Sequence, residues 1–197
     1  MKAPARAFTV PLPLLAYASG VISLSALPVV FPVLRAYCRY ERISVLSGEW
    51  WRLFTANLVH TNTSHWLLNM SGLLLTLFLF ETRIPAWRWL AVLIFSGFAS
   101  TAGLLLLPNI LWYVGLSGAL HGLFCYGALT DFRQGYRLGL GIFAVVAGKL
   151  AWEHWHGAEQ GVEALISAKV VTEAHLWGGL GGTLLAFTPL GRLKKPE

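Results

Sequence analysis

The stretch Gly115-Leu116-Ser117-Gly118-Ala119-Leu120-His121-Gly122 lies within a run of uncharged residues that extends from Trp89 to Thr130. This run is longer than one bilayer crossing needs, since roughly 20 apolar residues span the hydrocarbon core. A serine hydroxyl inside such a run has no water to bond with, and the glycines near it leave its side chain open to approach. We therefore expect Ser117 to be a functional group inside a membrane protein.

The composition is that of a membrane protein with several spans. Of the 197 residues, 56% are hydrophobic and only 12% are charged, and the mean hydropathy is +0.60, which excludes an ordinary water-soluble domain. The net charge of +6 is spread over single residues and pairs between apolar runs, so it forms no basic stripe for nucleic acid. The cysteines, Cys38 and Cys125, fall in a polar connection and an apolar run, and we expect no disulfide between them.

The apolar runs predict an all-α polytopic protein with six transmembrane helices in a single domain, residues 1–197. The expected spans are residues 11–34, 65–81, 87–107, 117–130, 138–153 and 173–190, and residues 35–64 form an amphipathic first loop. The first run is too long for the apolar region of a signal peptide, so we expect it to be retained. Pro108 and Asn109 divide the long uncharged run, which leaves a short central fourth helix that starts below the membrane surface at Ser117.

The segment 153–172 is expected to be an exposed loop. It contains several side chains that could suggest a metal site: His154, His156, Glu159 and Glu163. Their spacing matches no strong ligand pattern, and a solvated loop is the simpler interpretation. We therefore expect no metal and no cofactor.

Six spans place both termini on one side of the membrane. With that topology, the termini and the connections on their side hold nine basic residues, and the opposite side holds six. Because basic residues are enriched in cytoplasmic loops, this bias favours cytoplasmic termini. Ser117, His65 and the loop before His175 then face outward.

The fourth and sixth expected spans each carry two glycines four residues apart. These are Gly118 and Gly122 in the fourth span and Gly178 and Gly182 in the sixth. Such pairs let helix backbones approach closely in lipid. Ser117 adjoins the first pair, and His175 lies on the same side of its helix as the second. Packing the two faces would bring a general base to a serine hydroxyl, which is the requirement for nucleophilic catalysis.

His65 and Asn69 are one helical turn apart and project from one face of the second span. Both could donate hydrogen bonds to an oxyanion. Each feature also has a purely structural interpretation, because glycine pairs are common in membrane helices, a serine often bonds to its own helix and a histidine can bridge neighbours. Their coincidence favours an acyl-transfer site.

Four motifs together carry a resemblance to the rhomboid intramembrane serine proteases. They are Gly48-Glu49-Trp50-Trp51-Arg52, His65-x-x-x-Asn69, Gly115-Leu116-Ser117-Gly118 and Ala174-His175-x-x-Gly178-x-x-x-Gly182. The resemblance implies that Ser117 is the nucleophile and His175 the general base. It implies an oxyanion hole formed by His65, Asn69 and the backbone N–H of Ser117. The family works as a dyad, so no acidic third member is expected, and Glu173 is interpreted as a charge at the end of a loop.

His121 departs from the common rhomboid pattern, in which a tyrosine or phenylalanine at this position stacks on the catalytic histidine. This substitution, in a compact chain, resembles the rhombosortase subfamily. That resemblance implies substrates with a GlyGly-CTERM tail, on secreted or surface proteins, and a Gram-negative inner membrane with the site facing the periplasm. Whether His121 stacks, hydrogen-bonds to His175, contacts substrate or only packs is left open by the sequence.

A substrate helix would enter from the side, and its small residues would ease the local unwinding that exposes a carbonyl to Ser117. The acyl-enzyme would then pass to water or to an amine, and the sequence favours neither. The alternatives are a general rhomboid protease that cleaves other single-span proteins and a non-catalytic binder of membrane segments. A small transporter would need an internal repeat or a membrane-centred acid, and we find neither in the sequence.

Overall fold

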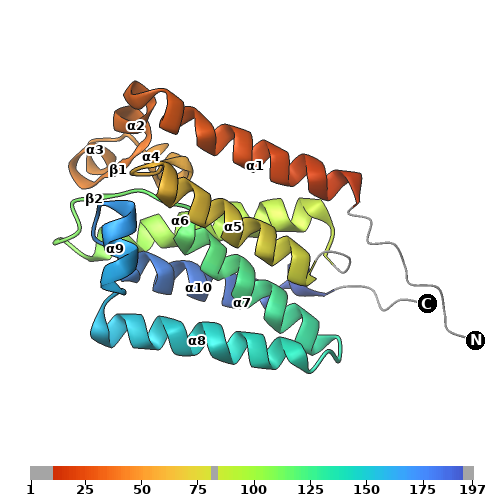
Figure 1. Ribbon diagram of the computed structural model, residues 1–197. Coiled ribbons are helices and arrows are strands. Elements are labelled where there is room, and N and C mark those ends of the chain that lie inside the picture. The colour runs from red at the N-terminus through yellow and green to blue at the C-terminus, as the bar shows by residue number, and fades with distance from the viewer. Residues whose placement is uncertain (1–10, 81–83, 193–197) are drawn as a thin grey trace, which may run out of the picture.

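The computed structural model describes residues 11–80 and 84–192, and these residues form a helical bundle. The longer helices run side by side (Figure 1) and are α1 Leu12–Val30, α5 Thr63–Phe80, α6 Ala86–Gly103, α7 Ser117–Arg133, α8 Leu138–His156 and α10 Thr172–Ala186. Most short elements gather at one end of this bundle. In chain order they are α2 Pro32–Cys38, β1 Tyr40–Glu41, α3 Arg42–Leu46, α4 Arg52–Thr55, η1 Ala56–Leu58, η2 Leu104–Leu106, β2 Trp112–Tyr113 and α9 Gln160–Ile166, with η3 Pro189–Gly191 following α10.

Among the described residues, three segments are long and apolar enough to cross a membrane. They are Leu12–Val30, Thr63–Phe80 and Ala86–Leu106. The helices α7 and α10 have 17 and 15 residues, which is short for a bilayer that roughly 20 helical residues cross. The prediction of an all-helical protein with membrane-crossing segments is confirmed.

The first predicted span, residues 11–34, differs from the helix that forms. Helix α1 ends at Val30, and a separate helix, α2, begins at Pro32. A proline ring disfavours helical backbone at the residue before it and supplies no N–H, so the chain turns at Phe31. Residue 81, the predicted end of the second span, lies outside the described residues. So do five of the basic residues on which the predicted orientation in the membrane rests. Those five are Lys2, Arg6, Arg83, Lys194 and Lys195.

Helix α7 lies against α6, α8 and α10 and is buried over most of its length. It contacts α10 backbone to backbone, because a side-chain carbon on Gly178 would overlap the carbonyl of Gly118 and one on Gly182 would overlap that of Gly122. The hydroxyl of Ser100 in α6 and the carbonyl of Ala174 in α10 both fill the space where a side-chain carbon on Gly118 would lie. Glycine is therefore needed where α7 meets α10.

The amphipathic first loop is tied to the rest of the bundle by two strands and by Arg52. Strand β1 pairs antiparallel with β2, which joins the loop to the segment that leads into α7. Arg52 is buried and donates to the carbonyls of Ala36 and Arg39 at 2.9 and 2.8 Å and to the carboxylate of Glu49 at 2.5 Å. One guanidinium thus joins three points of the loop, using the rigid donor fork that arginine supplies.

Arg52→Ala is expected to lower the free energy of unfolding by ~3 kcal/mol, because the Glu49 carboxylate and two carbonyls lose a charged donor. Unfolding in detergent micelles, followed by circular dichroism, measures this change. Arg39→Ala is the matched control, since the side chains of Arg39 and Glu41 are 40% and 39% exposed in their ion pair, and such pairs contribute ~1 kcal/mol or less. Equal losses in the two variants would show that Arg52 does not hold the loop.

Candidate active site

Ser117 and His175 face each other near the N-terminal ends of two helices. Ser117 is the first residue of α7, and His175 lies in the first turn of α10. The Oγ of Ser117 is 2.9 Å from Nε2 of His175, and His175 is buried. The glycine contact between α7 and α10 thus brings Ser117 and His175 within hydrogen-bond distance of each other, as the sequence predicted.

The backbone in front of Ser117 is fixed by a turn at Gly115. This glycine has a φ of 128°, a region that side chains disfavour. A carbon added to it would lie 2.8 Å from Nε2 of His65. Its N–H donates to the carbonyl of Ala56 at 3.1 Å. The turn therefore allows His65 to lie close to the start of α7.

His65 is buried in the first turn of α5, and its two ring nitrogens have different environments. The backbone N–H of Thr61 donates to Nδ1 at 3.4 Å, and the Thr61 hydroxyl is 3.1 Å from the same atom. That hydroxyl donates its proton to the carbonyl of Ile166 at 2.6 Å, so at Nδ1 it can only accept, whereas the Thr61 N–H can only donate to Nδ1; which ring nitrogen carries the proton depends on the tautomer. Asn69, one turn later, is also buried and donates to the carbonyl of His65 at 3.1 Å.

His60, which the sequence analysis did not single out, packs against His65. It is fully buried, and the two rings meet edge to face with centroids 5.0 Å apart. Burial, with a smaller contribution from the nearby His65, lowers the pKa of His60 to about 3. The ring of His60 is therefore neutral at physiological pH. A single histidine before the second span formed no recognisable pattern in the sequence.

His121 lies one turn after Ser117, and its ring stacks on that of His175 with centroids 4.3 Å apart and 23° between the ring planes. Its Nδ1 is 2.7 Å from the carbonyl oxygen of Ser117. A carbonyl can only accept, so Nδ1 carries the proton and Nε2 is an acceptor. The ammonium of Lys149 is 3.1 Å from this Nε2. In the structure, therefore, His121 stacks on His175 and forms its hydrogen bonds with the Ser117 carbonyl and with Lys149.

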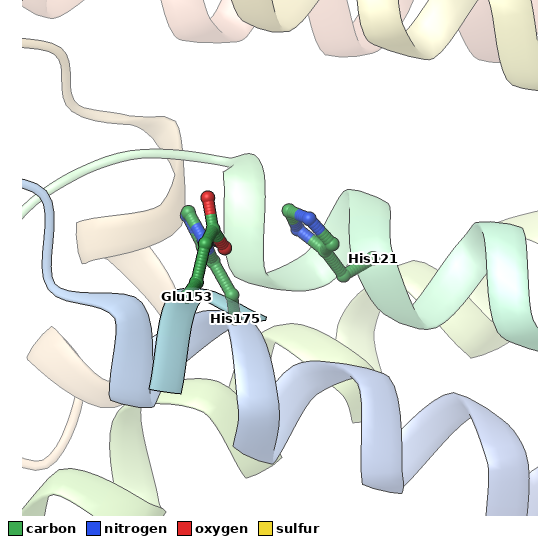
Figure 2. Close-up of side chains that lie close together, drawn as sticks. All are labelled: His121, Glu153 and His175. Carbon is green, nitrogen blue, oxygen red and sulfur yellow. Dashed lines mark hydrogen bonds and ion pairs between the residues drawn. The ribbon is translucent and has the colours of Figure 1, made fainter. Parts of the chain in front are cut away.

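Glu153 was expected in an exposed loop, and this expectation is wrong. Helix α8 continues to His156, and the side chain of Glu153 is only 12% exposed. Its Oε2 is 2.9 Å from Nδ1 of His175, and its Oε1 accepts from Lys149 at 2.6 Å. Figure 2 shows Glu153 directly beside His175, with His121 from α7 nearby. The sequence did contain a signal for this position: Glu153 follows Lys149 by four residues, which places the two side chains on one helix face at the end of an apolar run.

One cavity of about 580 Å³, at the end of the bundle where the short elements gather, is lined by the side chains described above except that of His60. Ser117 lies in its wall, and α9 contributes Val162 and Ile166 to the lining. Asn62, just before α5, holds α9 in place by donating to the carbonyl of Leu165 at 3.1 Å. The serine therefore opens into a chamber between the long helices and α9.

The described residues include one set that could hold a metal ion, formed by His121, Glu153 and His175, whose ligand atoms lie within 4.8 Å of one another. The ammonium of Lys149 already hydrogen-bonds two of these three side chains. A cationic side chain thus already bonds to His121 and Glu153 in this set. The other candidates that the sequence suggested, among them His154 and Glu163, do not join this set.

Residues 47–192 match the family model described as the Rhomboid domain. The chain belongs to the rhomboid family. Over 147 residues, which are 74% of this chain and 70% of the relative, this rhomboid is 31% identical to the protein named "Putative rhomboid protease YdcA" of Bacillus subtilis (strain 168). The family predicted from the sequence is confirmed, and with it the family-level activity of intramembrane serine proteolysis. The matched range contains every side chain of the cavity discussed above.

Proposed function

We propose that this rhomboid is an intramembrane serine endopeptidase with Ser117 as nucleophile and His175 as general base. The observation that carries the proposal is the 2.9 Å separation of Ser117 Oγ and His175 Nε2 in the wall of the cavity. As Oγ bonds to the scissile carbonyl carbon, His175 takes the hydroxyl proton and then passes it to the leaving amine. Water from the cavity hydrolyses the acyl-enzyme.

The oxyanion of this reaction would be stabilised by His65, Asn69 and the backbone N–H of Ser117. When Nδ1 of His65 accepts from the Thr61 N–H, its Nε2 carries the proton and lies beside the turn that precedes Ser117. Asn69 also lines the cavity. The N–H of Ser117 is among the first of α7, and such groups have no intrahelical partner. Preorganised donors of this kind stabilise the charge that develops in the transition state.

His65→Ala is expected to lower kcat for peptide cleavage by ~10²-fold, because one donor to the oxyanion is lost. His60→Phe is a useful companion, since it keeps an aromatic ring against His65 without providing a donor to the cavity. Cleavage kinetics in liposomes measure both variants. A His65→Ala enzyme with unchanged kcat would remove His65 from the oxyanion hole.

In the membrane, we place α1, α5, α6, α7, α8 and α10 as six spans, with both termini in the cytoplasm. The start of α1 and the end of α10 lie at one end of the bundle, and the short elements lie at the opposite end (Figure 1). Two of those short elements, β2 and α9, line the cavity. It would then open on the outer face, which for a Gram-negative inner membrane is the periplasmic side.

The substrate that we propose is the GlyGly-CTERM transmembrane tail of secreted or surface proteins, which makes this rhomboid a rhombosortase. His121 supports this specificity, because its ring stacks on His175 where other rhomboids commonly have tyrosine or phenylalanine. The alternative is a general rhomboid protease that cleaves other single-span proteins, and the similarity to YdcA is compatible with it. A non-catalytic binder of membrane segments would have no use for a serine bonded to a histidine.

The proposal is tested by purified protein in liposomes, given a fusion that ends in a GlyGly-CTERM tail and an unrelated single-span substrate. We expect cleavage of the fusion near its glycines, and mass spectrometry of the new terminus distinguishes hydrolysis from transfer to an added amine. Equal cleavage of both substrates would favour the general protease. Cleavage of neither substrate, at several lipid compositions, would contradict the proposed activity.

A further inference from the structure

We propose that Glu153 is a positioning residue for His175 and that Lys149 and His121 complete a closed hydrogen-bond ring around the dyad. The inference rests on the proposed function and adds an acidic third member to a site that the family resemblance describes as a dyad. The carboxylate of Glu153 reaches Nδ1 of His175 from α8, a helix that carries neither the nucleophile nor the base. Helices α7, α8 and α10 thus each contribute side chains to one hydrogen-bond network (Figure 2).

The proton positions follow from which groups can only donate or only accept. Lys149 only donates, and it donates to Oε1 of Glu153 and to Nε2 of His121. The ionised Glu153 only accepts, so Nδ1 of His175 must carry a proton. Nε2 of His175 is then the free acceptor that faces the hydroxyl of Ser117. This is the tautomer that a general base for Ser117 needs.

The ring closes on the nucleophile itself. Nδ1 of His121 donates to the carbonyl of Ser117, and the His121 ring stacks on His175. Ser117 is therefore joined to Lys149 along two routes, one through His175 and Glu153 and one through His121. Rotation of the His175 ring would break both its bond to Glu153 and its stacking on His121.

During the reaction the carboxylate keeps its charge. When Oγ of Ser117 bonds to the substrate carbonyl carbon, the hydroxyl proton moves to Nε2 of His175, and the imidazolium that forms donates from Nδ1 to Glu153. The proton then leaves from Nε2 to the departing amine, and His175 returns to its starting tautomer. Glu153 has only 12% of its side chain exposed and His175 only 7%, so little water competes for this bond.

The variants Glu153→Gln and Lys149→Met distinguish a positioning role for Glu153 from a purely structural one. In Glu153→Gln, the Lys149 ammonium can bond only the amide oxygen, which turns the NH₂ group toward His175. Nδ1 of His175 must then accept, its proton moves to Nε2, and the ring can no longer take the Ser117 proton. Adding Lys149→Met removes the group that holds the amide in this orientation, so the amide oxygen can turn back to Nδ1.

The experiment measures kcat and KM separately for Glu153→Gln, Lys149→Met, the double variant and Glu153→Asp in liposomes. Each value is normalised to the fraction of folded protein, determined by thermal unfolding. Glu173→Gln is the matched control, because Glu173 is an acid two residues before His175 with no hydrogen bond to it among the described residues. Labelling of Ser117 by a fluorophosphonate reports the same reactivity without a peptide substrate.

Glu153→Gln is expected to lower kcat by ~10³-fold with KM changed by less than about threefold, since only the general base is affected. The double variant should recover at least about tenfold over Glu153→Gln, Glu153→Asp should retain more activity than Glu153→Gln, and Glu173→Gln should stay within about threefold of wild type. A Glu153→Gln kcat close to wild type, or a double variant no faster than Glu153→Gln, would overturn the inference.

Ser117→Ala is measured in parallel: if it still cleaves, the proposed function fails, whereas an inactive Ser117→Ala beside an active Glu153→Gln leaves the dyad and removes Glu153.

Discussion

Ser117→Ala is expected to lower the rate of substrate cleavage by ~10⁴-fold or more, and His175→Ala by a similar factor. The Oγ of Ser117 lies 2.9 Å from Nε2 of His175, and neither atom can act without the other. Because the two residues form one functional unit, the double variant should be no slower than either single variant. Cleavage of the tail fusion in liposomes and fluorophosphonate labelling of the protein measure this loss.

Ser19→Ala is the matched control for the serine. Ser19 is an exposed residue of α1 whose hydroxyl bonds to the carbonyl of Ala16 in its own helix, and its loss should leave cleavage unchanged. Ser117→Ala should unfold at the same temperature as wild type, since no large side chain is removed. Residual cleavage by a Ser117→Ala enzyme that matches the wild-type rate would reject a serine mechanism.

Gly178→Ala is expected to lower both the stability and the activity of the protein. The added carbon would overlap the carbonyl of Gly118, and a backbone group cannot move aside as a flexible side chain can. Helices α7 and α10 must separate, at a cost of about 3 kcal/mol for an overpacked contact. The same movement pulls His175 away from Ser117, and a displacement of about 1 Å can cost ~10²-fold in rate.

Gly148→Ala provides the comparison for this substitution. Gly148 is also in a helix, α8, but a carbon added there meets nothing within 4 Å. Because alanine is the better helix former, this variant should be as stable as wild type or slightly more stable. Thermal unfolding and cleavage rates of the two variants test the difference. A Gly178→Ala enzyme that behaves like Gly148→Ala would show that the glycine contact does not set the site.

Much of the dyad geometry could be predicted because it depends on local periodicity. Glycines four residues apart lie on one helix face, and Ser117 and His175 occupy those faces on α7 and α10. The structure has the two glycine faces in backbone contact and the two side chains at 2.9 Å. The position of His65 and Asn69 on one face of α5 follows from the same rule of one helical turn.

Glu153 could not be predicted in the same way. Its partner His175 is 22 residues away on another helix, and no periodic pattern links them. Charged residues near the end of an apolar run usually mark the start of a loop, and that rule placed Glu153 in solvent. Here the charge is kept within the helix because Lys149 and His175 satisfy both carboxylate oxygens. The break at Phe31 was also missed, since hydropathy alone does not register where Pro32 interrupts the helix.

The contact between α7 and α10 also affects how the active site responds to substitutions elsewhere in the protein. Side chains in an ordinary helix interface can switch rotamers, and the spacing between helices then varies with temperature and sequence. At Gly118, Gly122, Gly178 and Gly182 no rotamer exists, because main-chain atoms themselves meet. The separation of the two helices at the nucleophile and its base is therefore set by van der Waals contact between backbones, which leaves little room for variation. Substitutions on the lipid-facing sides of the bundle can therefore accumulate without altering that separation.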